Sequence, residues 1–150
     1  MEEIKLIMDQ ALIDEYAEYY FKQHPKARKK PIEKPWHPSI NEWMIMPRPQ
    51  MNALKQKWKD FGVWWIEKLG YTNMMLDSFE IIEAVYFSNK IRRDVQNYIT
   101  KFLDDSFVAA GFIVDDDYKH YKKMTMMIDV DKNWPRTEIV IKPINKEEQQ

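Results

Sequence analysis

Residues 75–88 read MLDSFEIIEAVYFS and are the most strand-like stretch of the chain. Apolar side chains occupy both alternating faces of this stretch, as expected of a strand that is covered on both sides. It therefore predicts the central strand of a sheet. Glu83 interrupts the apolar run, and an unpaired charge at such a position is costly. We leave open whether Glu83 is paired with a Lys or Arg or has a chemical role.

Three other stretches carry apolar residues at helical spacing, namely residues 4–23, 54–69 and 94–110. Gly70 and Gly111 follow the second and third stretches, where a left-handed residue commonly ends a helix. We therefore predict three helices.

Two more strands are expected near the carboxyl end, over residues 119–130 and 136–144, where apolar and polar side chains alternate. A short turn joins them, so we predict a hairpin. Residues 36–49 hold several prolines and predict an extended segment or strand at a sheet edge.

The expected fold class is α+β, with helices packed on a small mixed β-sheet. The whole range 1–150 is expected to form one domain, since this length suits one core. Residues 1–37 would form an amino-terminal helix and a basic, proline-rich arm, and residues 145–150 a polar tail.

Composition limits the function. Lys and Arg number 23 against 24 Asp and Glu, so any contact with nucleic acid must come from a local patch. The absence of Cys excludes disulfides, thiolate zinc sites and cysteine nucleophiles. No apolar run is long enough to span a bilayer, and the acidic start is unlike a signal peptide, so we expect a cytoplasmic protein without membrane contact.

Two polar clusters flank the third predicted helix, RRDVQN at residues 92–97 and DDD at residues 115–117. Their spacing alone favours an ordinary interpretation, in which the carboxylates form turns and Asp94 caps the helix. The functional interpretation is a magnesium site, because this ion prefers carboxylate oxygen and water. Such an ion can polarise a phosphodiester and activate water.

The order of these motifs resembles the RusA family of Holliday junction resolvases. RDVQN at residues 93–97, a helix containing KFLD at 101–104, and AAGFIVDD at 109–116 are similar to the family pattern Arg-Asp-x-Asp-Asn, helix, Ala-Gly-x-x-x-Asp-Asp. PSINE at residues 38–42 is similar to the amino-terminal region of the family. The resemblance covers residues 38–144.

The resemblance implies a RusA-like, phage or prophage type of endonuclease from bacterial cytoplasm, active in DNA recombination and repair. It would be a homodimer that resolves four-way DNA junctions with Mg²⁺, for which Mn²⁺ could substitute, and with no organic cofactor. Asp94 and Asp116 would bind the metal and serve catalysis, with Asp115 and Gln96 as further ligands. Lys101 would be the catalytic lysine.

The chain departs from the family pattern at Gln96, where a second Asp is expected. An amide oxygen can ligate a cation but brings no charge and cannot act as a general base. Three explanations stay open: another carboxylate such as Glu83 or Asp117 substitutes, the site is weaker, or the chain binds branched DNA without cutting it. The last is the alternative function, a non-catalytic protein with a degenerate metal site. A helical interaction protein that uses a Tyr-rich first helix is a third possibility.

Basic side chains near these motifs would hold the DNA backbone. An ordinary solvated surface is an equally good interpretation of any single one of them. The candidates are Arg92, Arg93, Lys119, Lys122, Lys123, Lys29 and Lys30.

Overall fold

A four-stranded sheet organises the part of the chain that the computed structural model describes, residues 2–145. The elements are β1 (Ile4–Asp9), α1 (Gln10–Gln23), α2 (Ile40–Trp43), α3 (Arg48–Leu69), β2 (Phe79–Phe87), the 3-10 helix η1 (Val95–Tyr98), α4 (Lys101–Ala109), β3 (Tyr121–Val130) and β4 (Arg136–Pro143). The expected α+β class with a mixed sheet is confirmed. Residues 146–150, most of the predicted polar tail, lie outside the described residues.

The strand order is β1-β4-β2-β3, so β2 lies inside the sheet as predicted. β4 runs antiparallel to both β1 and β2, and β3 runs parallel to β2. The predicted hairpin of the last two strands is therefore wrong, because β2 lies between them. The turn after β3 crosses the end of β2, where the Asp131 N–H donates to the Phe87 carbonyl at 2.9 Å. Burial explains the order: β4 buries Ile139 and Ile141, whereas much of β3 is exposed and stays at the edge.

The predicted first helix is wrong in its first six residues, which form β1. Ile4, Leu6 and Met8 alternate inward and are buried, which is the period of a strand. Ile4 and Met8 are also four residues apart, so their spacing fits a helix equally well. The helix begins only after Asp9, whose side chain accepts a hydrogen bond from the Leu12 N–H at 3.0 Å.

The segment predicted as an extended edge, residues 36–49, instead contains the short helix α2. Ser39 caps this helix through a 3.3 Å bond from the Asn41 N–H to its hydroxyl. Ser39 and Glu42 have the spacing of a capping box, a signal that favours a helix start over a strand.

The long helix α3 is confirmed, although it begins at Arg48, and Gly70 ends it with a φ of 78°. The predicted helix over residues 94–110 is divided. η1 and α4 are separate elements, and Ile99 and Thr100 between them are not helical. Gly111 has the expected left-handed backbone, with a φ of 71°.

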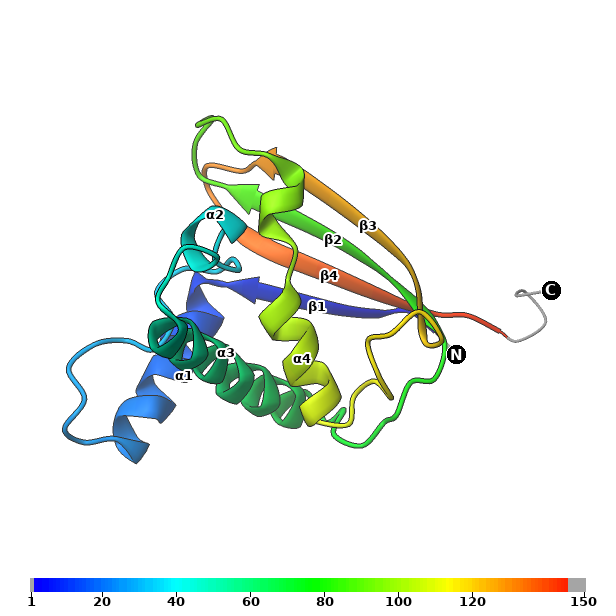
Figure 1. The fold of residues 1–150 in the computed structure, drawn as a ribbon, viewed down its shortest axis with the longest axis horizontal. Helices are drawn as coiled ribbons and strands as arrows, with labels where there is room; N and C mark the ends of the chain where they lie inside the picture. Colours follow the sequence, from blue (N-terminus) through cyan, green and yellow to red (C-terminus); the bar gives the residue numbers. More distant parts are fainter. Residues whose placement is uncertain (1, 146–150) are drawn as a thin grey trace.

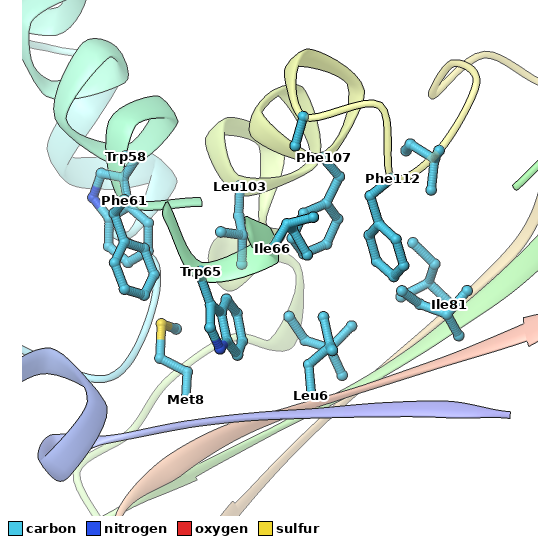
Figure 2. Close-up of a cluster of buried hydrophobic side chains, with 14 of the residues drawn as sticks. Leu6, Met8, Trp58, Phe61, Trp65, Ile66, Ile81, Leu103, Phe107 and Phe112 are labelled. Atoms are coloured by element: carbon cyan, nitrogen blue, oxygen red, sulfur yellow. The ribbon is translucent and has the colours of Figure 1, made fainter. Parts of the chain in front are cut away.

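Helices α1, α3 and α4 all cover the same side of the sheet (Figure 1). The core lies between them and the sheet and is rich in large aromatic side chains (Figure 2). Trp65 and Phe61 of α3 stack at 5.6 Å, and Phe107 of α4 meets Phe112 edge to face at 5.4 Å. None of the helices in the described range is long and apolar enough to cross a membrane.

The crossing of α3 and α4 depends on Gly62. A Cβ atom added at Gly62 would lie 1.7 Å from the Ser106 hydroxyl oxygen and 2.4 Å from the Ser106 Cβ. Ser106 is itself buried, and its hydroxyl donates to the Leu103 carbonyl. The two helices therefore approach closely at a point where only hydrogen fits.

We expect Gly62→Ala to lower the free energy of unfolding by about 1–3 kcal/mol, because overpacking outweighs the better helix propensity of Ala. Urea unfolding measures the change. Adding Ser106→Gly in the same chain removes the clashing Cβ and should recover part of the loss. A single Gly62→Ala variant as stable as the parent would contradict the close crossing.

A candidate acidic site between the sheet and α4

Two carboxylates are buried together on the helix-covered side of β2. Glu83 is fully buried and Asp104 of α4 is only 7% exposed. The Thr100 hydroxyl lies between them, 2.5 Å from Glu83 Oε1 and 3.0 Å from Asp104 Oδ1. The partner of Glu83 is thus a hydroxyl beside a second acid, and not a Lys or Arg, the pairing that the sequence had left open.

This geometry favours a bound proton when no cation occupies the site. A threonine hydroxyl has one hydrogen and can donate to only one of the two carboxyl groups. The other contact is a hydrogen bond only if that carboxyl group is protonated and donates to the threonine oxygen. Burial accordingly raises the pKa of Glu83 to about 7, and burial together with the neighbouring Glu83 raises the pKa of Asp104.

Asp116 extends the acidic site toward solvent. It is partly buried, and burial and the nearby Asp105 raise its pKa, while the Lys101 ammonium lowers it. The charge of Asp116 in turn raises the pKa of Asp104, so the two carboxyl groups are electrostatic neighbours. The structure thus brings the predicted site residues Asp116 and Lys101 together, and it adds Asp104.

Polar atoms without a hydrogen-bond partner point to unused binding capacity in this cluster. Glu83 Oε2 and the Tyr121 hydroxyl are buried and have no partner among the described residues. Burial and the charges of Asp104 and Glu83 raise the pKa of Tyr121. Buried groups of this kind usually find a partner, so their occurrence beside two acids marks the cluster as a candidate functional site.

Asp94 and Gln96 lie in a neighbouring depression, which they line together with Ile99, Met124 and Met126. This depression adjoins the acids, because Ile99 precedes Thr100 and Met126 is the β-sheet partner of Glu83. Asp94 occupies the capping position of η1, but its side chain makes no capping hydrogen bond. The ordinary interpretation of Asp94 as a side-chain cap is therefore wrong.

The other predicted acids, Asp115 and Asp117, accept backbone hydrogen bonds in the turn between α4 and β3. Asp115 Oδ1 accepts a hydrogen bond from the Asp116 N–H at 2.8 Å. Asp117 Oδ1 accepts from the Lys119 N–H at 3.1 Å, and the Asp117 carbonyl accepts from the Tyr121 N–H at 2.8 Å. Asp117 thus has the turn-forming role that its sequence context favours.

The predicted DNA-binding residues fall into two groups. Arg92, Lys119, Lys122 and Lys123 are exposed. Lys29, Lys30 and Arg93 line a separate groove, which is described below. Across residues 2–145, His, Asp and Glu side chains nowhere gather in threes in an arrangement that could hold a metal ion.

Thr100 and Asp104 are the site residues that the sequence reasoning missed. Asp104 belongs to α4 between Leu103 and Phe107, both of which are buried. A carboxylate on the apolar face of a short helix was the available signal, and it has the same physical meaning as Glu83 on its strand.

No protein family and no curated protein matches this sequence.

The raised pKa of Glu83 predicts a specific pH dependence of stability. Between pH 4.5 and about 7 the folded chain holds a proton at Glu83 that the unfolded chain has released. Stability from this group is therefore complete below pH 4.5 and declines as the pH rises to about 7. The loss amounts to at most about 3 kcal/mol.

Glu83→Gln cannot titrate at position 83, so its free energy of unfolding, measured with urea at pH 5 and pH 8, should decline less than that of the parent. Part of the decline remains, because burial also raises the pKa of Asp104. Burial lowers the pKa of His37 to about 4, which gives a slope of the opposite sign, but His37 is common to both proteins and cancels in their difference. Glu80→Gln, on the other face of β2, is the matched control. An unchanged pH dependence in Glu83→Gln would show that Glu83 is not the titrating group.

Proposed function

We propose that this protein is a divalent-metal-dependent endonuclease that cuts branched DNA. The observation that carries the proposal is the buried Glu83–Thr100–Asp104 cluster, with the charges of Asp116 and Lys101 nearby. Burying two acids side by side lowers stability, and such an arrangement is typical of sites that bind a cation or move a proton. The order of motifs shared with the RusA family supports DNA as the substrate.

The donor atoms of the acidic site suit magnesium, with manganese as a substitute. Carboxylate oxygens are its preferred protein ligands, and Glu83 Oε2 has no other partner. Magnesium usually takes one or two protein carboxylates and completes its shell with water and substrate phosphate. Asp104 and Asp116 would therefore hold the ion, with Glu83 behind them, and a preformed group of three ligands is not needed.

The bound ion would supply charge for the scissile phosphate and acidify a water molecule. The chain's own residues determine the rest. Asp116 is partly exposed and would hold the ion on the solvent side of the site, where the attacking water can reach it. Lys101 is exposed beside it and is placed to neutralise charge on the phosphate. Asp94 and Gln96, in the adjoining depression, would contact the substrate or complete the shell of the ion.

Exposed cations would hold the DNA, namely Arg92 before η1 and Lys119 and Lys122 around the start of β3. Lys123, also predicted to bind DNA, is the β-sheet partner of Glu80 and so lies on the face of the sheet away from the acids. A homodimer is part of the proposal, because a two-fold protein can place two such sites on a two-fold four-way junction. The resemblance to the RusA family also supports a phage or prophage source and a place in bacterial cytoplasm.

A synthetic four-way junction tests the activity. We expect the parent chain to nick it with magnesium, and Asp116→Asn and Asp104→Asn to reduce the rate at least about 100-fold, the scale of a lost catalytic carboxylate. Asp117→Asn, which alters a turn carboxylate in the same loop, should reduce it much less.

Gln96→Asp separates the remaining alternatives. If this variant nicks the junction and the parent does not, the ligand set is the one built on Asp94 and position 96. If both are inert while the junction still binds, the protein is the non-catalytic branched-DNA-binding alternative.

Magnesium should also raise the melting temperature of the protein without DNA, since a ligand that binds only the folded chain stabilises it. At ten times the dissociation constant the gain is about 1.4 kcal/mol, or several degrees. Asp116→Asn should lose most of this shift and Asp117→Asn should keep it. An equal shift in all three proteins would mean that the ion binds elsewhere.

A further inference from the structure

A second hollow, of about 480 Å³, is bordered by residues 29–39, α3 and η1. The residues of the acidic site, Glu83, Asp104 and Asp116, do not line it. Its walls combine basic and aromatic side chains. The cations are Lys29, Lys30, Lys34, Lys57 and Arg93, the aromatic residues are Trp36, Trp58 and Tyr98, and the acids are Glu33 and Glu42. We call this hollow the basic groove.

The wall formed by residues 29–39 is fixed to the body of the protein. The Thr137 hydroxyl of β4 donates to the Pro35 carbonyl at 2.7 Å. His37 is fully buried, accepts a hydrogen bond from the Phe102 N–H at 3.0 Å, and lies 2.9 Å from the Pro38 carbonyl through its other ring nitrogen. The segment predicted as a basic, proline-rich arm therefore packs on the body of the protein and forms a wall of the groove.

Much of the positive charge in the groove is not neutralised by carboxylates. Lys29, Lys34 and Lys57 are exposed and take part in no ion pair within the described residues, whereas Lys30 pairs with Asp14 at 3.2 Å. Arg93 is also without an ion pair there. Its guanidinium stacks 3.8 Å from the ring centroid of Phe87 and donates to carbonyls of the preceding loop. The net charge of the whole chain is only -1, so this concentration of cations is a local feature of the surface and does not reflect the overall composition.

Aromatic rings form one side of the groove among these cations. Trp36 and Tyr98 are partly exposed, and both pack on Phe87, with ring centroids 4.8 and 5.0 Å from it. Lys34 lies 5.8 Å from the centre of the Trp36 ring. Cations that follow a concave surface, with supported aromatic rings among them, are the features by which proteins hold unpaired nucleotides.

We propose that the basic groove binds a single-stranded segment of nucleic acid, with its phosphates on the lysines and a base against Trp36 or Tyr98. A duplex would leave these rings unused, because its bases are stacked inside. The inference deepens the proposed function, since a branched substrate offers unpaired nucleotides near its branch point, but binding in the groove needs neither the metal nor the acids.

The test is fluorescence anisotropy with a labelled 12-nucleotide oligo-dT, in EDTA so that no cleavage occurs. Lys57→Glu is compared with Lys59→Glu, which makes the same change of charge on the same helix but outside the groove, beside α1. We expect Lys57→Glu to weaken binding at least tenfold and Lys59→Glu less than twofold. Lys34→Ala should weaken it severalfold and reduce the salt dependence by about one counterion.

Equal losses in the two charge-reversal variants would overturn the groove, as would a parent chain that binds neither oligo-dT nor oligo-U. Equal affinity for a duplex of the same length would overturn the preference for single strands. Oligo-U in place of oligo-dT separates RNA from DNA, and stronger binding of either supports the groove. Urea unfolding must show each variant as stable as the parent. A parent chain that nicks the junction but binds neither oligo-dT nor oligo-U would reject this inference alone, and oligo-dT binding without nicking would reject only the nuclease.

Discussion

The burial of Glu83 on the covered face of β2 is the constraint around which this fold is arranged. A carboxyl group at that position needs a polar partner from the helical layer, because the core around it is aromatic and aliphatic. Thr100 supplies the partner, and its backbone is non-helical, with φ and ψ of -88° and 53°. The interruption between η1 and α4 thus coincides with the residue that must reach the buried acid. Asp104, one turn into α4, completes the group.

The acids lower the stability of the fold, and the rest of the core offsets that loss. Trp58, Phe61 and Trp65 of α3 and Phe102 and Phe107 of α4 bury large apolar surfaces in the core between the helices and the sheet. Large aromatic side chains also hold the two helices rigidly, and the close crossing at Gly62 and Ser106 fixes α4 against α3. A cluster of acids is kept in one geometry only if the elements that bear it cannot separate, which is what this packing provides.

Elements whose signal is local could be predicted from the sequence. The period of α3, the left-handed glycines at 70 and 111 and the apolar run of β2 were sufficient, because each depends on neighbouring residues alone. β1 could not be separated from α1, since residues four apart satisfy the periods of both a helix and a strand. The placement of β4 between β1 and β2 depends on which strand buries more apolar surface, a comparison across the whole chain.

The candidate site shows the same division. Asp116 and Lys101 were identified from a motif, and the structure brings them together. Glu83 was identified because a charge interrupted an apolar strand. Its neighbour Asp104 was missed, because 21 positions separate the two in sequence and only the docking of α4 on β2 brings them together. The resemblance drew attention to Asp94 and Gln96, but sequence spacing could not reveal that they line a depression beside the buried acids.

The first turn of α4 connects the acidic site to the basic groove. Thr100 binds Glu83 and Asp104 on one side of this turn, and two residues later the Phe102 N–H binds His37 from the wall of the groove. No side chain within the helix caps α4, so His37 satisfies a backbone donor that would otherwise be unpaired. Arg93 stands at the other junction, since it lines both the groove and the depression that holds Asp94. A strand lying in the groove would therefore be positioned relative to the acids by two short connections, the buried contact of His37 with α4 and the partly exposed Arg93, without a mobile arm or a second domain.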